Sequence, residues 1–139
     1  MIGIDTNILV YALDPTFAEH ERAKRALLAI DSRVVNATVI HETYHTLVFR
    51  RRMSPADSRT KIAEFLDDRR TGFVNLTRTV CLFALELASR MNLGGRDSLI
   101  IGSYLHDKIP EMYSHDEDLV GLGKVAMRGR AIRITDPVK

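Results

Sequence analysis

The sequence predicts an α/β fold, a three-layer α/β/α sandwich with a central, mostly parallel sheet. Short β-rich segments alternate with longer helical patterns along the chain, and this alternation is typical of parallel strands that are connected by helices. The length of 139 residues is enough for one domain with a hydrophobic core and too short for two ordinary domains. We therefore expect residues 1–139 to form a single domain.

Five segments have the composition of strands. Each is short, rich in residues that favour strands, and separated from the next by a helical pattern. The five segments are 2–4, 34–37 (VVNA), 72–76 (GFVNL), 111–114 (EMYS) and 131–135 (AIRIT).

The helices are predicted from apolar residues that recur at helical spacing. They are expected over 8–13 (ILVYAL), 17–30, 38–52, 54–69, 77–91 and 96–107. Ser54 and Pro55 provide the helix over 54–69 with an N-cap and a first-turn proline. The helix over 77–91 is apolar around much of its circumference, so we expect this helix and its residue Cys81 to be buried.

Composition and charge are those of an ordinary globular protein, with 45% hydrophobic and 27% charged residues. A net charge of +2 permits an anionic partner without requiring one. Basic residues gather at 50–52, at 69–70 and along 124–133. They would neutralise phosphates if they converged on one face, whereas separate solvated helix ends would need no partner.

A single cysteine, Cys81, excludes an intramolecular disulfide and any cysteine-built metal site, which indicates a reducing compartment. The first residues, MIGIDTN, contain an acid and lack the basic region of a signal peptide. No apolar run approaches the length that crosses a membrane. We expect a cytoplasmic protein that does not associate with membranes.

Residues 41–45, HETYH, fit the pattern H-E-x-x-H, in which two histidines bind zinc and the glutamate activates water. A zinc peptidase also needs a third ligand. The extended motif would place glycine and histidine where this chain has Val48 and Arg51. A zinc peptidase is therefore the less favoured alternative, and we interpret His41 and His45 as surface or groove residues beside Glu42.

Two aspartates occupy positions with more than one explanation. Asp5 directly follows the first strand, at the end where parallel sheets bind ligands, although an N-cap role would also explain it. Asp97 shares a helical face with Ile100 and Tyr104, so its carboxylate needs a partner unless it caps the helix. An ionised carboxylate in a core is costly unless it is hydrogen-bonded, paired or bound to a metal.

Further acids follow at other strand and helix positions. Glu42 lies opposite the apolar stripe of its helix, where it faces either solvent or an open groove. Ser114, Asp116 and Asp118 place a hydroxyl and two acids at the end of the strand 111–114. Several carboxylates in one cleft repel each other unless divalent cations neutralise them. All-oxygen ligands suit Mg²⁺ or Mn²⁺, which activate water and stabilise phosphodiester displacement.

The order of these motifs resembles the PIN-domain family, and most closely the small single-domain ribonuclease toxins of VapC type. The motifs run through nearly the whole chain and read IGIDTNILVYAL, ATVIHETYHTL, GGRDSLIIGSYL and MYSHDEDL. Each motif alone is weak, whereas four in this order are specific. The resemblance implies a central parallel sheet and an acidic pocket that binds Mg²⁺ or Mn²⁺.

The resemblance also assigns roles to individual residues. It places the four catalytic and metal-binding acids of the family on Asp5, Glu42, Asp97 and Asp116. It places supporting polar residues on Thr6, Asn7, Ser114 and Asp118. The chain departs from the family pattern at Ser98, Gly102, Leu119 and His115, and none of these departures removes an acid.

A metal-dependent endoribonuclease is the function that the resemblance implies, with 5′-phosphate and 3′-hydroxyl products. As a toxin of a toxin–antitoxin pair it would have RNA as its substrate, an antitoxin protein as its partner and a homodimeric state. The alternative is a PIN-like module that binds RNA or protein without cutting. Such modules tend to lose acids, and this chain retains all four.

Overall fold

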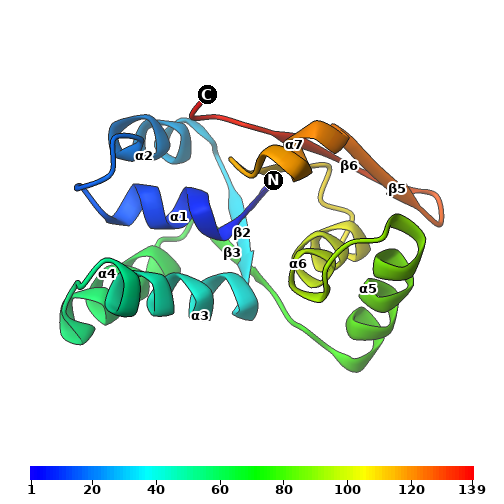
Figure 1. Cartoon of the computed structure of the whole chain (residues 1–139), viewed down its shortest axis with the longest axis horizontal. Coiled ribbons are helices and arrows are strands. Elements are labelled where there is room, and N and C mark those ends of the chain that lie inside the picture. The colour runs from blue at the N-terminus through cyan, green and yellow to red at the C-terminus, as the bar shows by residue number, and fades with distance from the viewer.

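A computed structural model describes all residues from 1 to 139 and contains a six-stranded sheet with helices around it (Figure 1). The strands are β1 (Ile2–Ile4), β2 (Arg33–Asn36), β3 (Thr71–Val74), β4 (Glu111–Tyr113), β5 (Lys124–Met127) and β6 (Arg130–Thr135). The helices are α1 (Thr6–Leu13), α2 (His20–Ala29), α3 (Ala37–His45), the π-helix η1 (Thr46–Arg50), α4 (Pro55–Asp67), α5 (Arg78–Met91), α6 (Gly95–His106) and α7 (Glu117–Leu122).

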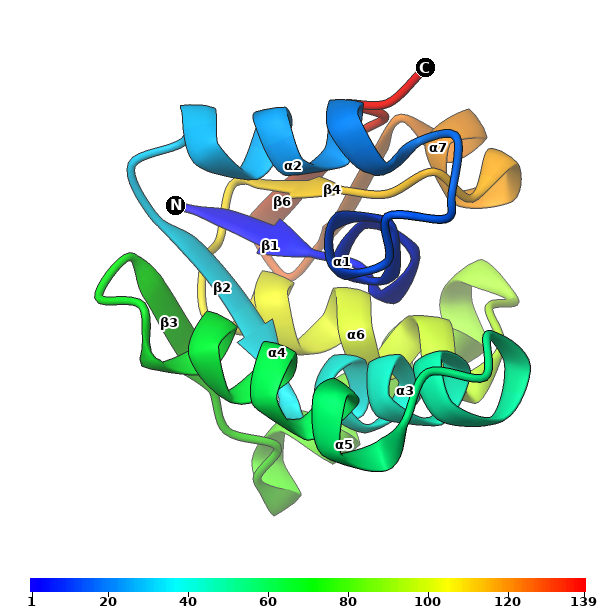
Figure 2. The ribbon, with the colours of Figure 1, turned by 90° about the vertical axis from the view of Figure 1, so that its left-hand side faces the viewer.

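The sheet has the strand order β3-β2-β1-β4-β6-β5, and every neighbouring pair is parallel except β5 with β6. Helices lie on both faces: α2 passes over one face and α6 over the other (Figure 2). The predicted α/β class with a mostly parallel central sheet is confirmed. None of the helices combines the length and the apolar character needed to cross a bilayer.

Strand β1 lies at the centre of the sheet, between β2 and β4. The loops that leave β1 and β4 therefore start side by side at the carboxyl edge of the sheet. Two backbone hydrogen bonds continue the pairing there: the Asp5 N–H donates to the Tyr113 carbonyl at 3.0 Å, and the Ser114 N–H donates to the Thr135 carbonyl at 2.9 Å. Asp5 and Asp116, the first and the fourth of the predicted acids, follow β1 and β4 at this edge.

Helix α6 is fixed to β1 by a buried tyrosine. Tyr104 is fully buried in a hydrophobic core of 28 residues, and its hydroxyl donates to the Ile4 carbonyl at 2.7 Å. The ring lies so close to Gly3 that a Cβ built on this glycine would come within 2.5 Å of the ring. Gly3 is thus needed for α6 to approach the strand that carries Asp5.

Several predicted boundaries need correction. Helix α2 begins at His20 instead of residue 17, because Asp14 accepts a hydrogen bond from the Thr16 N–H at 2.9 Å and closes a turn first. The predicted helix over 38–52 ends as a π-helix at Arg50. The predicted N-cap Ser54 is confirmed, since its hydroxyl accepts from the Asp57 N–H.

The expectation that the helix over 77–91 is buried is wrong for one of its faces. Helix α5 packs on α6, but Leu82 and Leu85 are 52% and 64% exposed, and Cys81 is exposed as well. Helix α7 and strand β5 were not predicted. Strand β5 alternates exposed and buried residues, and its turn to β6 carries positive φ at Arg128 and Gly129.

Candidate active site

Asp5 is the most buried of the predicted acids, with 6% of its surface exposed. It ends β1 and caps α1: one carboxylate oxygen accepts from the Thr6 N–H at 2.8 Å and the other from the Ser114 hydroxyl at 2.7 Å. Burial raises the pKa of Asp5 from 3.8 to about 6, although its two hydrogen bonds oppose the shift. The carboxylates of Asp97 and Glu42 raise the pKa further, so these acids already repel one another.

Thr6 connects the first acid to the second. Its backbone N–H binds Asp5, and its hydroxyl donates to Glu42 at 2.7 Å across from α1 to α3. The Glu42 side chain is 22% exposed, so it faces an open groove rather than bulk solvent. Asn36 caps α3 by accepting from the Val39 N–H at 3.0 Å, which fixes the start of the helix that carries Glu42.

Arg96 connects the second acid to the third. Its guanidinium lies 3.1 Å from the Glu42 carboxylate and 3.5 Å from that of Asp97. Burial lowers the pKa of Arg96, but the two carboxylates outweigh this effect and the pKa is raised. Asp97 lies in the first turn of α6, 27% exposed, while Ile100 and Tyr104 on the same helix are buried.

The loop after β4 brings the fourth acid to the first. The buried Ser114 hydroxyl donates to Asp5 and accepts from the Asp116 N–H at 3.1 Å. Asp116 caps α7, and Asn7 accepts from the backbone N–H of His115 at 3.3 Å. Asp118 is exposed and contributes its N–H to Asp116, whereas its side chain lines none of the cavities described here.

Three of the four predicted acids line one cleft of about 240 Å³. These are Asp5, Asp97 and Asp116, together with Thr6, Asn7 and Arg96. Glu42 lies in an adjoining polar groove of about 410 Å³, which shares Thr6, Thr46 and Arg96 with the cleft. The four acids thus form one continuous network around Thr6, Ser114 and Arg96.

The donor set of this network suits a hard divalent cation. Its acidic members offer carboxylate oxygens, the ligands that Mg²⁺ and Mn²⁺ prefer, and their mutual repulsion would be relieved by positive charge. No three His, Cys, Asp or Glu side chains lie close enough to bind one ion as they stand, because the acids are spread and Arg96 lies between two of them. The chemistry of the donors therefore fits, and Arg96 supplies positive charge to two of them in this structure.

The two histidines of HETYH both line the polar groove beside Glu42. His45 packs against Phe49 in a tilted arrangement, with ring centroids 5.1 Å apart. His41 and His45 are not joined by a third residue of the kind that binds zinc. Their placement as groove residues agrees with the interpretation made from the sequence.

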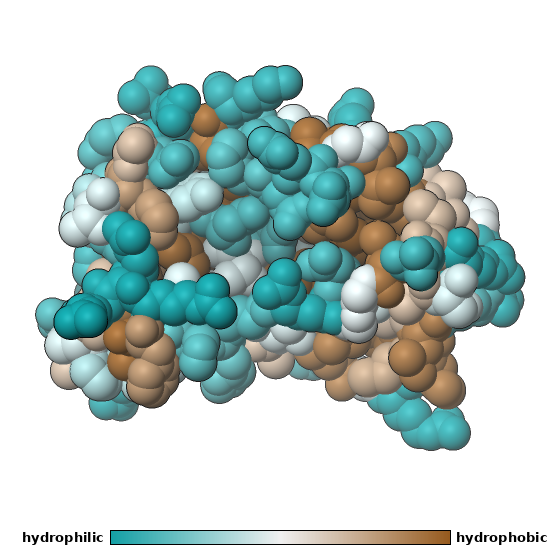
Figure 3. Space-filling view, viewed as in Figure 1, coloured by the Kyte–Doolittle hydropathy of each residue, from teal (hydrophilic) through white to brown (hydrophobic).

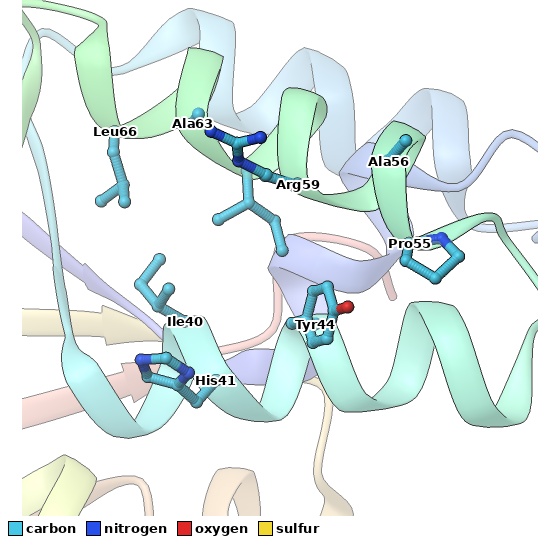
Figure 4. A pocket seen from close by; sticks show the side chains of 9 residues that line it. Ile40, His41, Tyr44, Pro55, Ala56, Arg59, Ala63 and Leu66 are labelled. Atoms are coloured by element: carbon cyan, nitrogen blue, oxygen red, sulfur yellow. The ribbon is translucent and has the colours of Figure 1, made fainter.

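A larger hollow of about 560 Å³ lies between α3 and α4, away from the acids (Figure 4). Its wall from α3 includes Ile40 and Tyr44, and its wall from α4 includes Ile62 and Leu66. Figure 4 shows side chains of the two helices facing each other across this apolar groove. Its lining contains no carboxylate and is mostly hydrophobic, so it offers a surface for apolar contact rather than a set of ligands for a metal ion.

The basic clusters seen in the sequence are partly neutralised within the chain. Several of their members form ion pairs within the chain: Arg51 with Asp14, Arg70 with Asp68, Arg128 with Glu86 and Arg133 with Glu111. Of the residues 50–52, only Arg50 lines the polar groove. Arg96, which belongs to no cluster, was missed; its position directly before Asp97 is the signal that would have identified it.

The chain is similar to known proteins in its family pattern and in its fold. The family model for the PIN domain matches residues 2–125. No curated protein sequence is significantly similar to the chain. Among solved structures, VapC20 of Mycobacterium tuberculosis, a sarcin–ricin loop cleaving toxin, is similar with a TM-score of 0.76 and 21% identity, covering 92% of this chain and 99% of that one.

Two complexes contain similar chains. A toxin–antitoxin complex from Klebsiella pneumoniae has a TM-score of 0.70 at 16% identity, covering 99% of this chain and 98% of that one. DNA-bound VapBC from Salmonella typhimurium has a TM-score of 0.67 at 15% identity, covering 98% of each. These similarities concern the fold, while the family match spans most of the sequence. The chain belongs to the PIN domain family.

Proposed function

We propose that the protein is a metal-dependent endoribonuclease that hydrolyses RNA phosphodiester bonds. The observation that carries the proposal is the convergence of Asp5, Asp97 and Asp116 on one cleft, with Glu42 joined to it through Thr6. Membership of the PIN domain family supports nuclease activity. The RNA substrate is supported by the sequence resemblance to VapC-type ribonucleases.

In this proposal Asp5, Glu42, Asp97 and Asp116 hold one or two Mg²⁺ or Mn²⁺ ions. When bound, such ions activate water and stabilise the attacking and leaving oxygens of the phosphodiester. Glu42 orients or deprotonates the attacking water, since its carboxylate faces the open groove.

The supporting residues keep the acids in position. Ser114 holds the Asp5 carboxylate and the loop that carries Asp116, Thr6 holds Asp5 and Glu42, and Asn7 ties the same loop to α1. Asp118 stabilises Asp116 through its backbone N–H. Such supporting contacts are worth roughly 10–100-fold in metal affinity or activity where they have been removed elsewhere.

The proposed biological role is that of the toxin in a cytoplasmic toxin–antitoxin pair, with residues 1–139 acting as one nuclease unit. The similar chains in toxin–antitoxin complexes support an antitoxin partner. The apolar groove between α3 and α4 is a surface that such a partner could cover. An antitoxin that also reached the acids would block the cleft.

A homodimer is also part of the proposal. Leu82 and Leu85 are exposed on α5, and apolar atoms gather on the side of the molecule that α5 occupies (Figure 3). Adjacent exposed leucines are a candidate surface for association, because single domains rarely leave large apolar patches in water. Helix α5 is therefore the element we expect at the dimer interface.

The proposed activity is tested by incubating purified protein with total RNA in EDTA, in Mg²⁺ and in Mn²⁺. We expect no cleavage in EDTA, cleavage on addition of either metal, and products with 5′-phosphate and 3′-hydroxyl ends. Binding of RNA without cleavage in any metal would instead favour the non-cleaving module. Stoichiometric zinc in the purified protein that is lost in His45→Ala would favour the peptidase.

A further inference from the structure

One face of the continuous helix α3–η1 lines an open polar groove. Thr38, Glu42, His45 and Phe49 recur at intervals of three or four residues on this face. The groove that the face forms contains no hydrophobic lining residue, and its lining is Thr6, Thr38, His41, Glu42, His45, Thr46, Arg50 and Arg96. Three residues of the HETYH motif, His41, Glu42 and His45, therefore line this open groove.

The groove offers cationic and neutral donors that the fold does not use. Arg50 forms no ion pair, in contrast to its neighbour Arg51, which pairs with Asp14 at 3.1 Å. The side chains of His41 and His45 likewise make no hydrogen bond within the chain, so their ring nitrogens remain available. An anion that entered the groove would meet Arg50, His41 and His45, while the Glu42 carboxylate in the same lining is paired with Arg96 at 3.1 Å.

An aromatic pair lies beside the groove: His45 lines it, and Phe49, which is outside its lining, contacts His45. Phe49 is 69% exposed and packs against His45, with the two ring planes tilted by 36°. Phe49 directly precedes Arg50 in the chain, so the exposed ring is the neighbour of a cationic residue that lines the groove. Exposed aromatic rings beside positive charge are the usual platform for bases of single-stranded nucleic acids, because every base has a face that can stack.

We infer that this groove binds a single-stranded RNA nucleotide next to the scissile phosphate. The base stacks on Phe49 and His45, and Arg50 binds the adjoining backbone phosphate. The inference rests on the proposed function, because the groove opens into the acidic cleft through their shared walls at Thr6, Thr46 and Arg96. An acidic peptide would use the arginine but would gain nothing from the aromatic pair, which favours RNA.

The test measures the affinity of the full chain for a fluorescein-labelled single-stranded RNA of mixed sequence by fluorescence anisotropy, in EDTA and low salt. Phe49→Ala should weaken binding about tenfold, and Phe49→Tyr should retain it, because stacking is restored. Arg50→Gln should weaken binding and lower the slope of log Kd against log salt by about 0.7, as expected for one lost phosphate contact on a single strand. The slope should not change in Phe49→Ala.

Matched controls are Phe73→Ala, another exposed aromatic residue on β3, and Arg25→Gln, an exposed arginine on α2. Both should bind RNA like the unaltered protein. Wild-type affinity in Phe49→Ala and Arg50→Gln would overturn the inference, as would displacement of the RNA by an equal concentration of polyglutamate. If the unaltered protein neither binds nor cleaves RNA in any metal, the proposed function itself fails.

Discussion

Asp5 illustrates how the fold changes the chemistry of a single side chain. The sequence places it after a strand, and either an N-cap or a metal ligand would explain that position. The structure shows that Asp5 caps α1 and also lines the acidic cleft, so the two explanations are compatible. Its burial is costly for the charged form, and this cost leads to a measurable pH dependence.

We predict that Asp5→Asn stabilises the metal-free protein at pH 7.5 by up to about 3 kcal/mol, because each unit of pKa shift corresponds to about 1.4 kcal/mol and the pKa of Asp5 rises from 3.8 to about 6. The folded chain holds this proton more tightly than the unfolded chain. Stability of the unaltered protein therefore falls as the pH rises from about 4 to 6, and the cost is fully present above that window.

Thermal unfolding in EDTA, followed by circular dichroism, measures this effect. The melting temperature of Asp5→Asn should exceed that of the unaltered protein at pH 7.5, and the two should converge near pH 4. Asp107→Asn, an exposed aspartate at the other end of α6, serves as the control. Equal melting temperatures of Asp5→Asn and the unaltered protein at both pH values would show that burial of Asp5 has no such cost.

The ion pair of Arg96 with Glu42 could not be predicted from the sequence. The four acids could be predicted because strand ends and helix faces follow from short patterns in the sequence. The bridge from Arg96 to Glu42 joins α6 to α3, and no local pattern encodes a contact between two residues so far apart in the chain.

Arg96→Gln should lower the melting temperature in EDTA but not in Mn²⁺, because the ion then neutralises the same carboxylates. Equal losses with and without Mn²⁺ would contradict this prediction.

Among the elements, the central strands and long helices could be predicted because their apolar periods are strong. Strand β5 was read as part of a basic cluster, since every second residue faces solvent and only Val125 and Met127 are buried. The exposed face of α5 was also read wrongly. Apolar residues predict burial, but they do not show whether the partner surface belongs to the same chain.

Strand β1 and helix α6 are predicted to depend on the absence of a side chain at Gly3. Gly3→Ala would push its Cβ to within 2.5 Å of the buried Tyr104 ring, so we expect a loss of about 1–3 kcal/mol in the free energy of unfolding. Gly72 on β3 is the matched control, because a Cβ there meets its nearest atom at 3.7 Å. Urea unfolding of both alanine variants tests this, and equal stability of the two would contradict the close approach.

For the whole molecule, we predict that the protein is a dimer in solution and that Leu85→Glu converts it to a monomer. A charge on this exposed residue of α5 would have to be desolvated at the interface. Leu28→Glu on α2, where the leucine is 57% exposed, should remain a dimer. Light scattering gives the mass directly, and an unaltered mass for Leu85→Glu would place the interface elsewhere.

In our proposal the acids at the carboxyl edge of the sheet form the metal site of a ribonuclease. The most direct test is the RNA cleavage rate in Mn²⁺ of the unaltered protein, Asp97→Asn and the control Asp107→Asn. We predict that Asp97→Asn falls by about 100-fold or more, since residues that only support metal ligands already contribute roughly 10–100-fold, while Asp107→Asn keeps its rate. Cleavage by Asp97→Asn at the full rate, or by the unaltered protein in EDTA, would contradict the claim.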